Sequence, residues 1–427
     1  MPAQKKGYFS ITSRFLMVLS AGKSMAFQKP DSVRLLPVLT WLVYTIVYLG
    51  RINLSISIPF LQNEFGYSKA TLGFLASGFF VSYAAGQLIN GVMGDRVQAR
   101  YFVSLGLIAA GISNIIFSVT RSFPVMFIVW SGNGYFQSML WGPMLRTITD
   151  YIPPQKRFRA LFLMSTSPVI GYFLSYILSG QLAVNIGWEA AFLVPGILFM
   201  LIAGTWYWGI GKIAYKTPDQ TTPRVTGSMP GMEIINFFFQ SKIYLLVILG
   251  VLVGIAKEGL ILWSPSIFTE FFTRELGKTL FLLSLMPVIN FCFVILNGVL
   301  YKKYPGKEHR IIIVYLATAI LSTTFIWHSA NYIFFIRSFF FYCLMASLYA
   351  ITIFMASYLP CNYMKNGRVS ATAGIIDSSF YLGAAIAGPL MGTMAEKFGW
   401  AGIFAGIMVI CAAALLPNAI LHSTFSK

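Results

Sequence analysis

The sequence predicts an all-α integral membrane protein with twelve membrane-spanning helices in two pseudo-symmetric six-helix bundles. Three observations lead to this fold class: the composition is apolar, the apolar residues form twelve long runs, and short motifs recur at matching places in the two halves. Of the 427 residues, 57% are apolar and 10% are charged. Because soluble domains carry about 25% charged residues, this chain is predicted to lie in a bilayer.

The residues outside the apolar runs exclude several classes of protein. The net charge of +18 does not indicate nucleic-acid binding, because the basic residues lie in short breaks between apolar runs and form no basic face interleaved with aromatic residues. The sequence contains no phosphate-binding loop, nucleophile elbow or zinc motif, so neither an enzyme nor a cofactor is expected. The cysteines and histidines lack ligand spacing and predict neither disulfides nor a metal site; they are Cys292, Cys343, Cys361, Cys411, His309, His328 and His422.

Residues 1–34 hold several lysines and arginines around one short apolar stretch at 15–19. That stretch is too short for a usual signal peptide, so we expect no cleaved leader. A basic segment of this kind is typical of a helix that lies on an anionic cytoplasmic membrane surface.

Twelve apolar runs follow, and each can cross a bilayer, which takes about 20 residues. They lie at 35–60, 70–92, 101–119, 124–149, 159–184, 188–211, 243–270, 279–301, 311–329, 331–360, 370–394 and 399–422. The polar stretch between the sixth and seventh runs predicts a flexible cytoplasmic linker. The predicted domains are an N-terminal segment at 1–34, a bundle at 35–211, the linker at 212–242, a second bundle at 243–422 and a tail at 423–427.

Short motifs repeat between the two sets of six runs. The pairs are Asn90-Gly91-Val92 with Asn297-Gly298-Val299, and Gly187-Trp188 with Gly399-Trp400. Each match is weak alone, but both fall at equivalent spans. Together they predict a duplicated architecture, which is typical of transporters that work by alternating access.

The basic residues predict the orientation. With the N-terminus in the cytoplasm, most of the 31 lysines and arginines fall on the inner side, and the outer loops hold only Lys69, Arg121, Arg274, Lys278 and Lys397. This asymmetry predicts a multi-pass protein of the cell (inner) membrane with both termini in the cytoplasm. We expect a monomer surrounded by membrane lipids.

A charged residue lies inside the first span. Tyr44, Tyr48, Arg51 and Ser55 share one face of a helix and form a polar stripe on an otherwise apolar span. An arginine at the centre of a bilayer costs about 2.5–3.5 kcal/mol on insertion scales, so we interpret the stripe as facing an internal cavity. The alternative is that Arg51 reaches towards the headgroups from near the helix end.

The first span of the second half holds a second cation, Lys257. Two cations at the interface of two bundles predict a binding site for an anion. The alternative is a structural network with Glu258 on the same span and Asp377 on the eleventh span. Adjacent helical residues project about 100° apart, so Glu258 is not required to pair with Lys257. Either acid could instead carry a proton.

Two further polar stripes are consistent with a shared cavity or with hydrogen bonds between helices. They are formed by Tyr83, Gln87 and Asn90 on the second span, and by Asn133, Gln137 and Trp141 on the fourth.

A short cytoplasmic loop predicts a gate. Gly94, Asp95 and Arg96 follow the second span, and Arg146 with Asp150 ends the fourth span nearby at helical spacing. We expect Asp95 to interact with Arg146 or a neighbouring helix terminus.

These residues resemble a known family. The Gly94-Asp95-Arg96 loop resembles the signature of the major facilitator superfamily, and longer motifs in both halves resemble its organophosphate:phosphate antiporter branch. Those motifs include Tyr44, Tyr48 and Arg51-Ile52-Asn53, Gly134 to Gln137 with Trp141, Pro143 and Arg146-Thr147, Gly259 with Trp263-Ser264-Pro265, Ala373-Gly374 with Tyr381-Leu382-Gly383, and Phe398-Gly399-Trp400. The resemblance implies that the cavity is lined by Tyr44, Tyr48, Arg51, Tyr83, Gln137, Trp141, Lys257 and Tyr381.

The sequence also departs from the glycerol-phosphate exchangers of that branch. Ile52, Gln87 and Pro168 stand where those proteins carry a second cation, a lysine and a histidine, and Lys257 replaces an arginine. A lysine lacks the forked donor that an arginine offers to phosphate. The acids Glu258 and Asp377 also bring the cavity close to neutral.

The predicted function is secondary transport of a small organic anion, most consistent with a phosphorylated metabolite exchanged for inorganic phosphate. Two alternatives stay open. The same fold could couple a carboxylate or a zwitterion to protons, or it could serve as a sensor that binds a ligand without transporting it.

Overall fold

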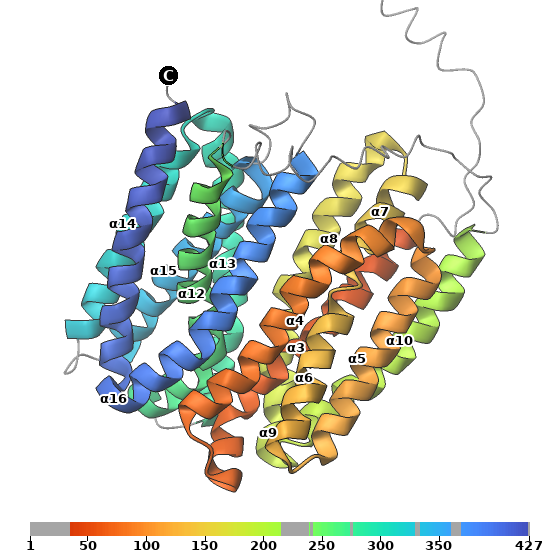
Figure 1. Ribbon diagram of the computed structural model, residues 1–427, viewed down its shortest axis with the longest axis horizontal. Helices are drawn as coiled ribbons and strands as arrows, with labels where there is room; N and C mark the ends of the chain where they lie inside the picture. Colours follow the sequence, from red (N-terminus) through yellow and green to blue (C-terminus); the bar gives the residue numbers. More distant parts are fainter. Residues whose placement is uncertain are drawn as a thin grey trace, which may run out of the picture.

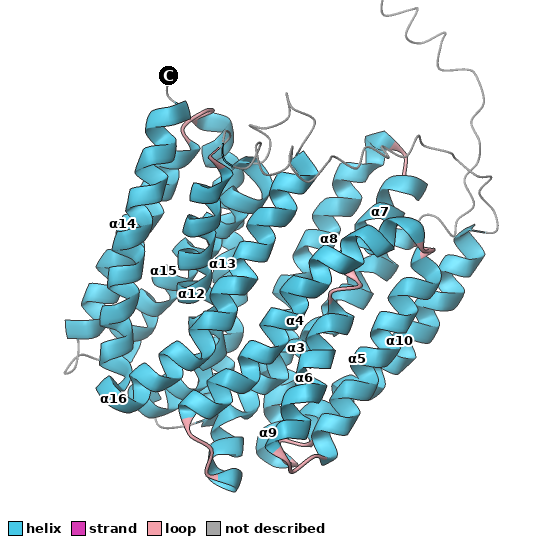
Figure 2. Ribbon diagram, in the orientation of Figure 1, coloured by secondary structure: helices cyan, strands magenta, loops and turns pink. Residues whose placement is uncertain are grey.

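The computed structural model describes residues 35–214, Phe239, 242–273, 276–328, 334–359 and 369–425. These residues are helical throughout except for short turns (Figure 2). The predicted N-terminal segment, and all but the ends of the predicted linker, lie outside them.

Two bundles of helices stand side by side (Figure 1). The first bundle contains α3 (Leu36–Phe65), α4 (Lys69–Arg96), α5 (Ala99–Val119), α6 (Phe123–Gln137), α7 (Trp141–Tyr151), α8 (Pro154–Leu174), η2 (Ser175–Ser179), α9 (Gly180–Asn185) and α10 (Ala190–Ala214). The second contains α12 (Ile243–Ile267), η3 (Phe268–Thr273), α13 (Leu276–Lys303), α14 (Glu308–His328), α15 (Phe334–Ile353), η4 (Phe354–Tyr358) and α16 (Val369–Phe425). The segments η2, η3 and η4 are π-helical turns that continue the preceding helix.

Ten helical stretches of the described chain are long and apolar enough to cross a membrane. Within the described residues, each of the twelve predicted runs is nevertheless mainly helical. The fourth run is divided into α6 and α7 by a turn at 138–140, and α16 joins the last two runs across a break at Gly399. Many large apolar side chains point outward, including Leu88, Val314 and Leu321, as expected of helices in lipid. The predicted membrane fold is confirmed.

A glycine with positive φ precedes the last predicted span of each bundle. Gly187 has φ +139° and Gly399 has φ +67°, which are backbone conformations that favour glycine. A tryptophan follows each glycine, so the repeated Gly-Trp motif marks equivalent turns.

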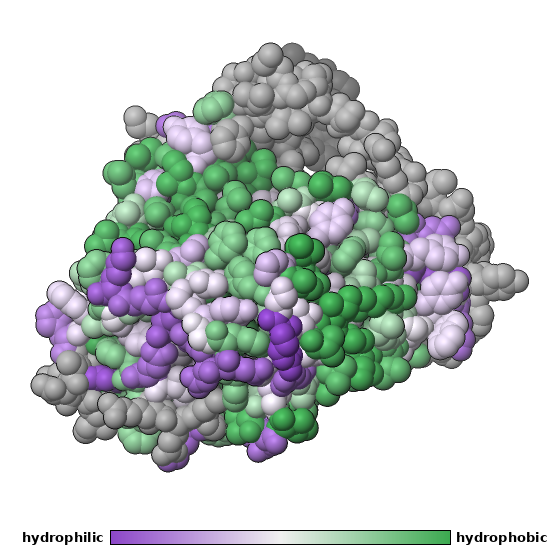
Figure 3. Space-filling model, turned by 60° about the horizontal axis from the view of Figure 1, so that its bottom comes forward, coloured by the Kyte–Doolittle hydropathy of each residue, from purple (hydrophilic) through white to green (hydrophobic). Residues whose placement is uncertain are grey.

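The bundles meet at one end and diverge towards the other, where the C-terminus lies (Figure 1). We call them the joined end and the splayed end. At the joined end, Gly73 of α4 and Gly388 of α16 lie backbone to backbone, and a Cβ on either would overlap the other's carbonyl group. The Ser77 hydroxyl also donates to the Ala385 carbonyl oxygen. Figure 3 views this end and shows hydrophilic residues gathered on it between hydrophobic flanks.

Candidate functional site

A break in α3 lies directly before Arg51. Gly50 has non-helical φ −93° and ψ 18°, and its carbonyl oxygen accepts hydrogen bonds from Asn133 Nδ2 at 3.0 Å and Gln137 Nε2 at 2.9 Å. Asn133 also accepts from Asn114, which in turn accepts from Asn53. These buried amides hold the broken turn in place, since a backbone carbonyl without a partner is costly in an apolar interior.

Aromatic rings surround the Arg51 guanidinium. Its central carbon lies 4.3 Å from the ring centre of Tyr83, 5.3 Å from Tyr381, 5.4 Å from Phe79 and 5.6 Å from Tyr48. Arg51 Nη2 donates to the Tyr381 hydroxyl at 3.1 Å, which links α3 of one bundle to α16 of the other. Within the described residues no carboxylate forms an ion pair with Arg51. Cation–π contacts hold the charge in place and leave most of its donors available for an anion.

The remaining tyrosines predicted for the cavity continue this aromatic surface. Tyr44 packs on Trp141 with ring centres 4.7 Å apart and on Tyr48 at 5.6 Å. Tyr48 packs on Tyr172 at 4.7 Å. The structure therefore brings together six of the residues that the family resemblance implied for the cavity, namely Tyr44, Tyr48, Arg51, Tyr83, Trp141 and Tyr381.

Gln137 lies in the same region, but its side chain donates a hydrogen bond to the backbone of α3. Its amide nitrogen is committed to Gly50 and to Asn133 Oδ1 at 3.1 Å. Its Oε1 atom is buried and has no hydrogen-bond partner among the described residues. Gln137 therefore positions the turn that carries Arg51.

Lys257 and Glu258 form an ion pair, with Lys257 Nζ 2.7 Å from Glu258 Oε1. The sequence did not require this pair, because neighbouring helical residues diverge, but long side chains can bridge that angle. Lys257 is 8% exposed, and its Nζ lies 5.5 Å from the ring centre of Tyr349 and 5.9 Å from that of Phe380.

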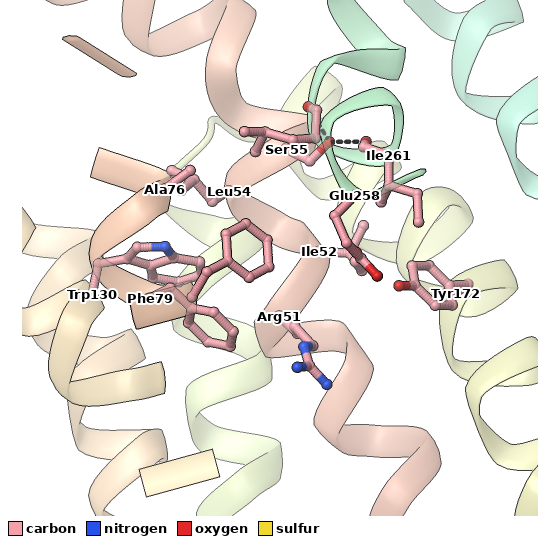
Figure 4. Close-up of a pocket in the computed structure, with 12 residues that line it drawn as sticks. Arg51, Ile52, Leu54, Ser55, Ala76, Phe79, Trp130, Tyr172, Glu258 and Ile261 are labelled. Carbon is pink, nitrogen blue, oxygen red and sulfur yellow. Dashed lines mark hydrogen bonds between the residues drawn. The ribbon is translucent and has the colours of Figure 1, made fainter. Parts of the chain in front are cut away.

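A small pocket lies beside Arg51 between the two bundles (Figure 4). Arg51 from α3 and Glu258 from α12 are its charged lining residues. The Glu258 carboxylate and the Tyr172 hydroxyl point towards each other (Figure 4). Asp377 on α16 lies against the Gln87 side-chain amide of α4.

The predicted gate is described only in part. Arg146 Nη1 donates to the Gly94 carbonyl oxygen at 3.0 Å, and Arg146 Nε lies 3.3 Å from Asp150 Oδ2. Gly94 lies in the last turn of α4, where the sequence predicted a loop, and this turn is thereby tied to α7. The side chains of Asp95 and Arg96 lie outside the described part of the structure.

Several aromatic residues around Arg51 were not predicted from the sequence, among them Tyr172 and Phe79. Tyr172 on α8 lies four residues before Tyr176 on η2, and this spacing repeats that of Tyr44 and Tyr48. The repeated spacing could have identified α8 as a wall of the cavity. Phe79 lacks such a signal, since a phenylalanine is ordinary in any span.

Comparisons with known proteins agree with this geometry. Residues 40–360 match the Major Facilitator Superfamily. Over 402 residues the chain is 25% identical to the probable hexose phosphate transport protein of Chlamydia trachomatis, with 88% of each chain covered. It is 24% identical over 399 residues to the membrane sensor protein UhpC of Escherichia coli, covering 88% of this chain and 90% of that protein.

A shorter match and a solved structure extend the comparison. The chain is 32% identical over 165 residues to the glycerol-3-phosphate transporter of Bacillus subtilis, covering 38% of this chain and 37% of that protein. Its fold is similar to the crystal structure of a bacterial homologue of the human lysosomal transporter Spinster in an inward-facing, unoccupied conformation. That similarity has a TM-score of 0.70 at 17% identity, covering 93% of this chain and 95% of the other.

Proposed function

The chain belongs to the major facilitator superfamily, and from that membership we propose that it is a secondary transporter that exchanges a phosphorylated organic anion for inorganic phosphate. The names of the relatives support a phosphorylated substrate, because they include hexose-phosphate and glycerol-phosphate transporters. The resemblance to the organophosphate:phosphate antiporter branch agrees with those names.

The surroundings of Arg51 are the observation that carries the proposal. Its guanidinium lies between the bundles, is held by aromatic rings and hydrogen-bonds Tyr381 of the opposite bundle. Arginine presents a planar fork of donors that suits a phosphoryl group. An anion bound there contacts both bundles at once and can therefore favour one arrangement of them over another.

The distribution of lysine and arginine supports a topology with both termini in the cytoplasm of a bacterial cell. With this orientation the joined end faces outward and the splayed end faces the cytoplasm, so the structure represents an inward-facing conformation. Alternating access then requires the joined end to separate while the splayed end closes.

Uptake into proteoliposomes tests the proposal. Vesicles that contain the purified protein and internal phosphate should take up labelled phosphate or hexose phosphate, and Arg51→Ala should weaken binding roughly ten- to hundredfold, the range for a charge-assisted hydrogen bond. Arg121→Ala, which removes an arginine outside the cavity, is the matched control. Binding that is unchanged in Arg51→Ala would refute the site, and uptake that follows only an imposed pH gradient would refute exchange.

The similarity to UhpC favours a second candidate, a sensor that binds the same ligand without moving it. The two functions differ in one measurement. A sensor would bind hexose phosphate through Arg51 and show no counterflow in proteoliposomes, whereas a transporter shows both.

A further inference from the structure

The pocket beside Arg51 presents one positive and one negative group from opposite bundles. Arg51 enters from α3 and Glu258 from α12, and the other lining residues are apolar, aromatic or hydroxyl-bearing. Figure 4 shows the Glu258 carboxylate on the side of the pocket formed by Tyr172. Each bundle therefore contributes one charged side chain to this region, a cation from the first and a carboxylate from the second.

Lys257 does not act as a second free cation in this conformation. Its ammonium group is directed to Glu258 and lies near the rings of Tyr349 and Phe380, and the residue does not line the pocket. Because the carboxylate neutralises the ammonium group, the pair adds no net positive charge to the cavity. The Glu258 side chain still reaches the pocket and can accept further hydrogen bonds, since a carboxylate has about four acceptor positions.

The two cations and two carboxylates around the pocket have no net charge. Arg51 and Lys257 are opposed by Glu258 and by Asp377, which lies against Gln87 on the facing helix. A simple phosphate monoester brings about −1.5 to −2 charges at pH 7. It would meet one guanidinium not paired to a carboxylate and would place its remaining charge near two carboxylates. A substrate that carries its own cation avoids this repulsion.

We infer that the site is built for a phosphate ester that also carries an amine, such as an amino-sugar phosphate. The phosphoryl group binds Arg51 and the ammonium group binds Glu258, so the ligand matches a charge from each bundle. This inference rests on the proposed function and narrows its substrate class. It assigns to Glu258 a role in specificity, in place of a structural role as the partner of Lys257 alone.

Two esters that differ in one group provide the test. Glucosamine 6-phosphate and glucose 6-phosphate differ only by an amine in place of a hydroxyl, and their binding to the purified protein is measured by titration at pH 7. The wild-type protein should bind the amino ester about tenfold more tightly, as expected for an additional hydrogen bond between charged groups. Glu258→Gln should remove that preference without weakening the binding of glucose 6-phosphate, because Lys257 is then no longer neutralised.

A second variant guards against misfolding of Glu258→Gln, which leaves Lys257 buried without its partner. The double variant Lys257→Gln/Glu258→Gln removes both charges and should also lose the preference. Glu64→Gln, a carboxylate outside the cavity, should keep it. Equal binding of the two esters by the wild-type protein, or a preference that persists in both Glu258 variants, overturns the inference alone. If neither ester binds the wild-type protein, the proposed function fails as well.

Discussion

The joined end holds two similar clusters, each made of a tryptophan, a glutamate and a basic residue. They differ in which bundle supplies the basic residue. In the first bundle, the Trp188 indole nitrogen donates to Glu64 at 2.5 Å, and Arg121 lies 3.5 Å from the same carboxylate. In the second bundle, the Trp400 indole nitrogen donates to Glu270 at 3.0 Å. There the cation is Lys69, which comes from α4 of the opposite bundle and lies 3.0 Å from Glu270.

The source of the basic residue gives the two clusters different structural roles. The cluster around Glu64 closes within its own bundle, where Arg121 also binds Glu189 at 2.7 Å. The cluster around Glu270 joins the bundles. If the joined end opens during transport, the contact between Lys69 and Glu270 breaks, and the contact between Arg121 and Glu64 persists. Four predictions test this contrast.

Charge reversal should have the largest effect. Glu270→Lys places like charges opposite each other across the bundles, and we expect it to shift the population about tenfold or more towards the state open at the joined end. Distances between one spin label on α4 and one on α16, both placed at the joined end, report this shift. Glu64→Lys is the control: it should lower the thermal midpoint without changing the distance distribution. If both variants changed the distance distribution equally, the two clusters would not differ in their role at the interface.

Loss of either indole donor should have a smaller and matched effect. Trp188→Phe and Trp400→Phe each remove one hydrogen bond to a carboxylate, which contributes about 1.5–3 kcal/mol. Both should lower the thermal unfolding midpoint by similar amounts, and neither should alter the label distances, since Lys69 keeps its contact with Glu270. A shift in distance for Trp400→Phe alone would show that the indole also joins the bundles.

Removing the cations should have a still smaller effect. Exposed ion pairs contribute about 0.2–1 kcal/mol, and the side chain of Lys69 is 18% exposed, compared with 48% for Arg121. Lys69→Ala should therefore shift the conformational population by up to about fivefold. Arg121→Ala should leave the population unchanged and alter only stability. The opposite pattern would contradict the assignment of the two clusters.

Salt should have the smallest effect. Raising the ionic strength from 0.1 to 1 M shortens the screening length from about 10 to 3 Å. The wild-type distance distribution should then move slightly in the direction of Lys69→Ala, and Lys69→Ala itself should not respond. A response of equal size in that variant would mean that other charges are involved.

The sequence predicted the spans and the repeat because both follow from local patterns. A span needs an apolar run of a certain length, and a turn with positive φ needs a glycine, so the twelve runs and the Gly-Trp pairs are visible without a structure. The carboxylate partners of the tryptophans, Glu64 and Glu270, were not predicted. Each lies at the far end of another helix, and only the packed bundle brings it to the indole.

For the candidate site, local patterns in the sequence predicted only part of the arrangement around Arg51. The stripe of Tyr44, Tyr48 and Arg51 follows from helical spacing, and the structure places these side chains together. The pairing of Lys257 with Glu258 depends on side-chain rotamers, which helical spacing does not specify. The break at Gly50 also has no local signal, because its cause is a pair of amides on α6.

The backbone contact between Gly73 and Gly388 also decides where the membrane voltage falls. Helices that touch without side chains between them leave no room for water at the point of contact. When the cavity is filled with water from the splayed side, most of the electric field drops across this thin layer. Moving one elementary charge through it changes the energy by about 2.3 kcal/mol per 100 mV. The close contact of the two glycines is thus part of the barrier that separates the cavity from the other side of the membrane, and a Cβ at either position would force the two helices apart.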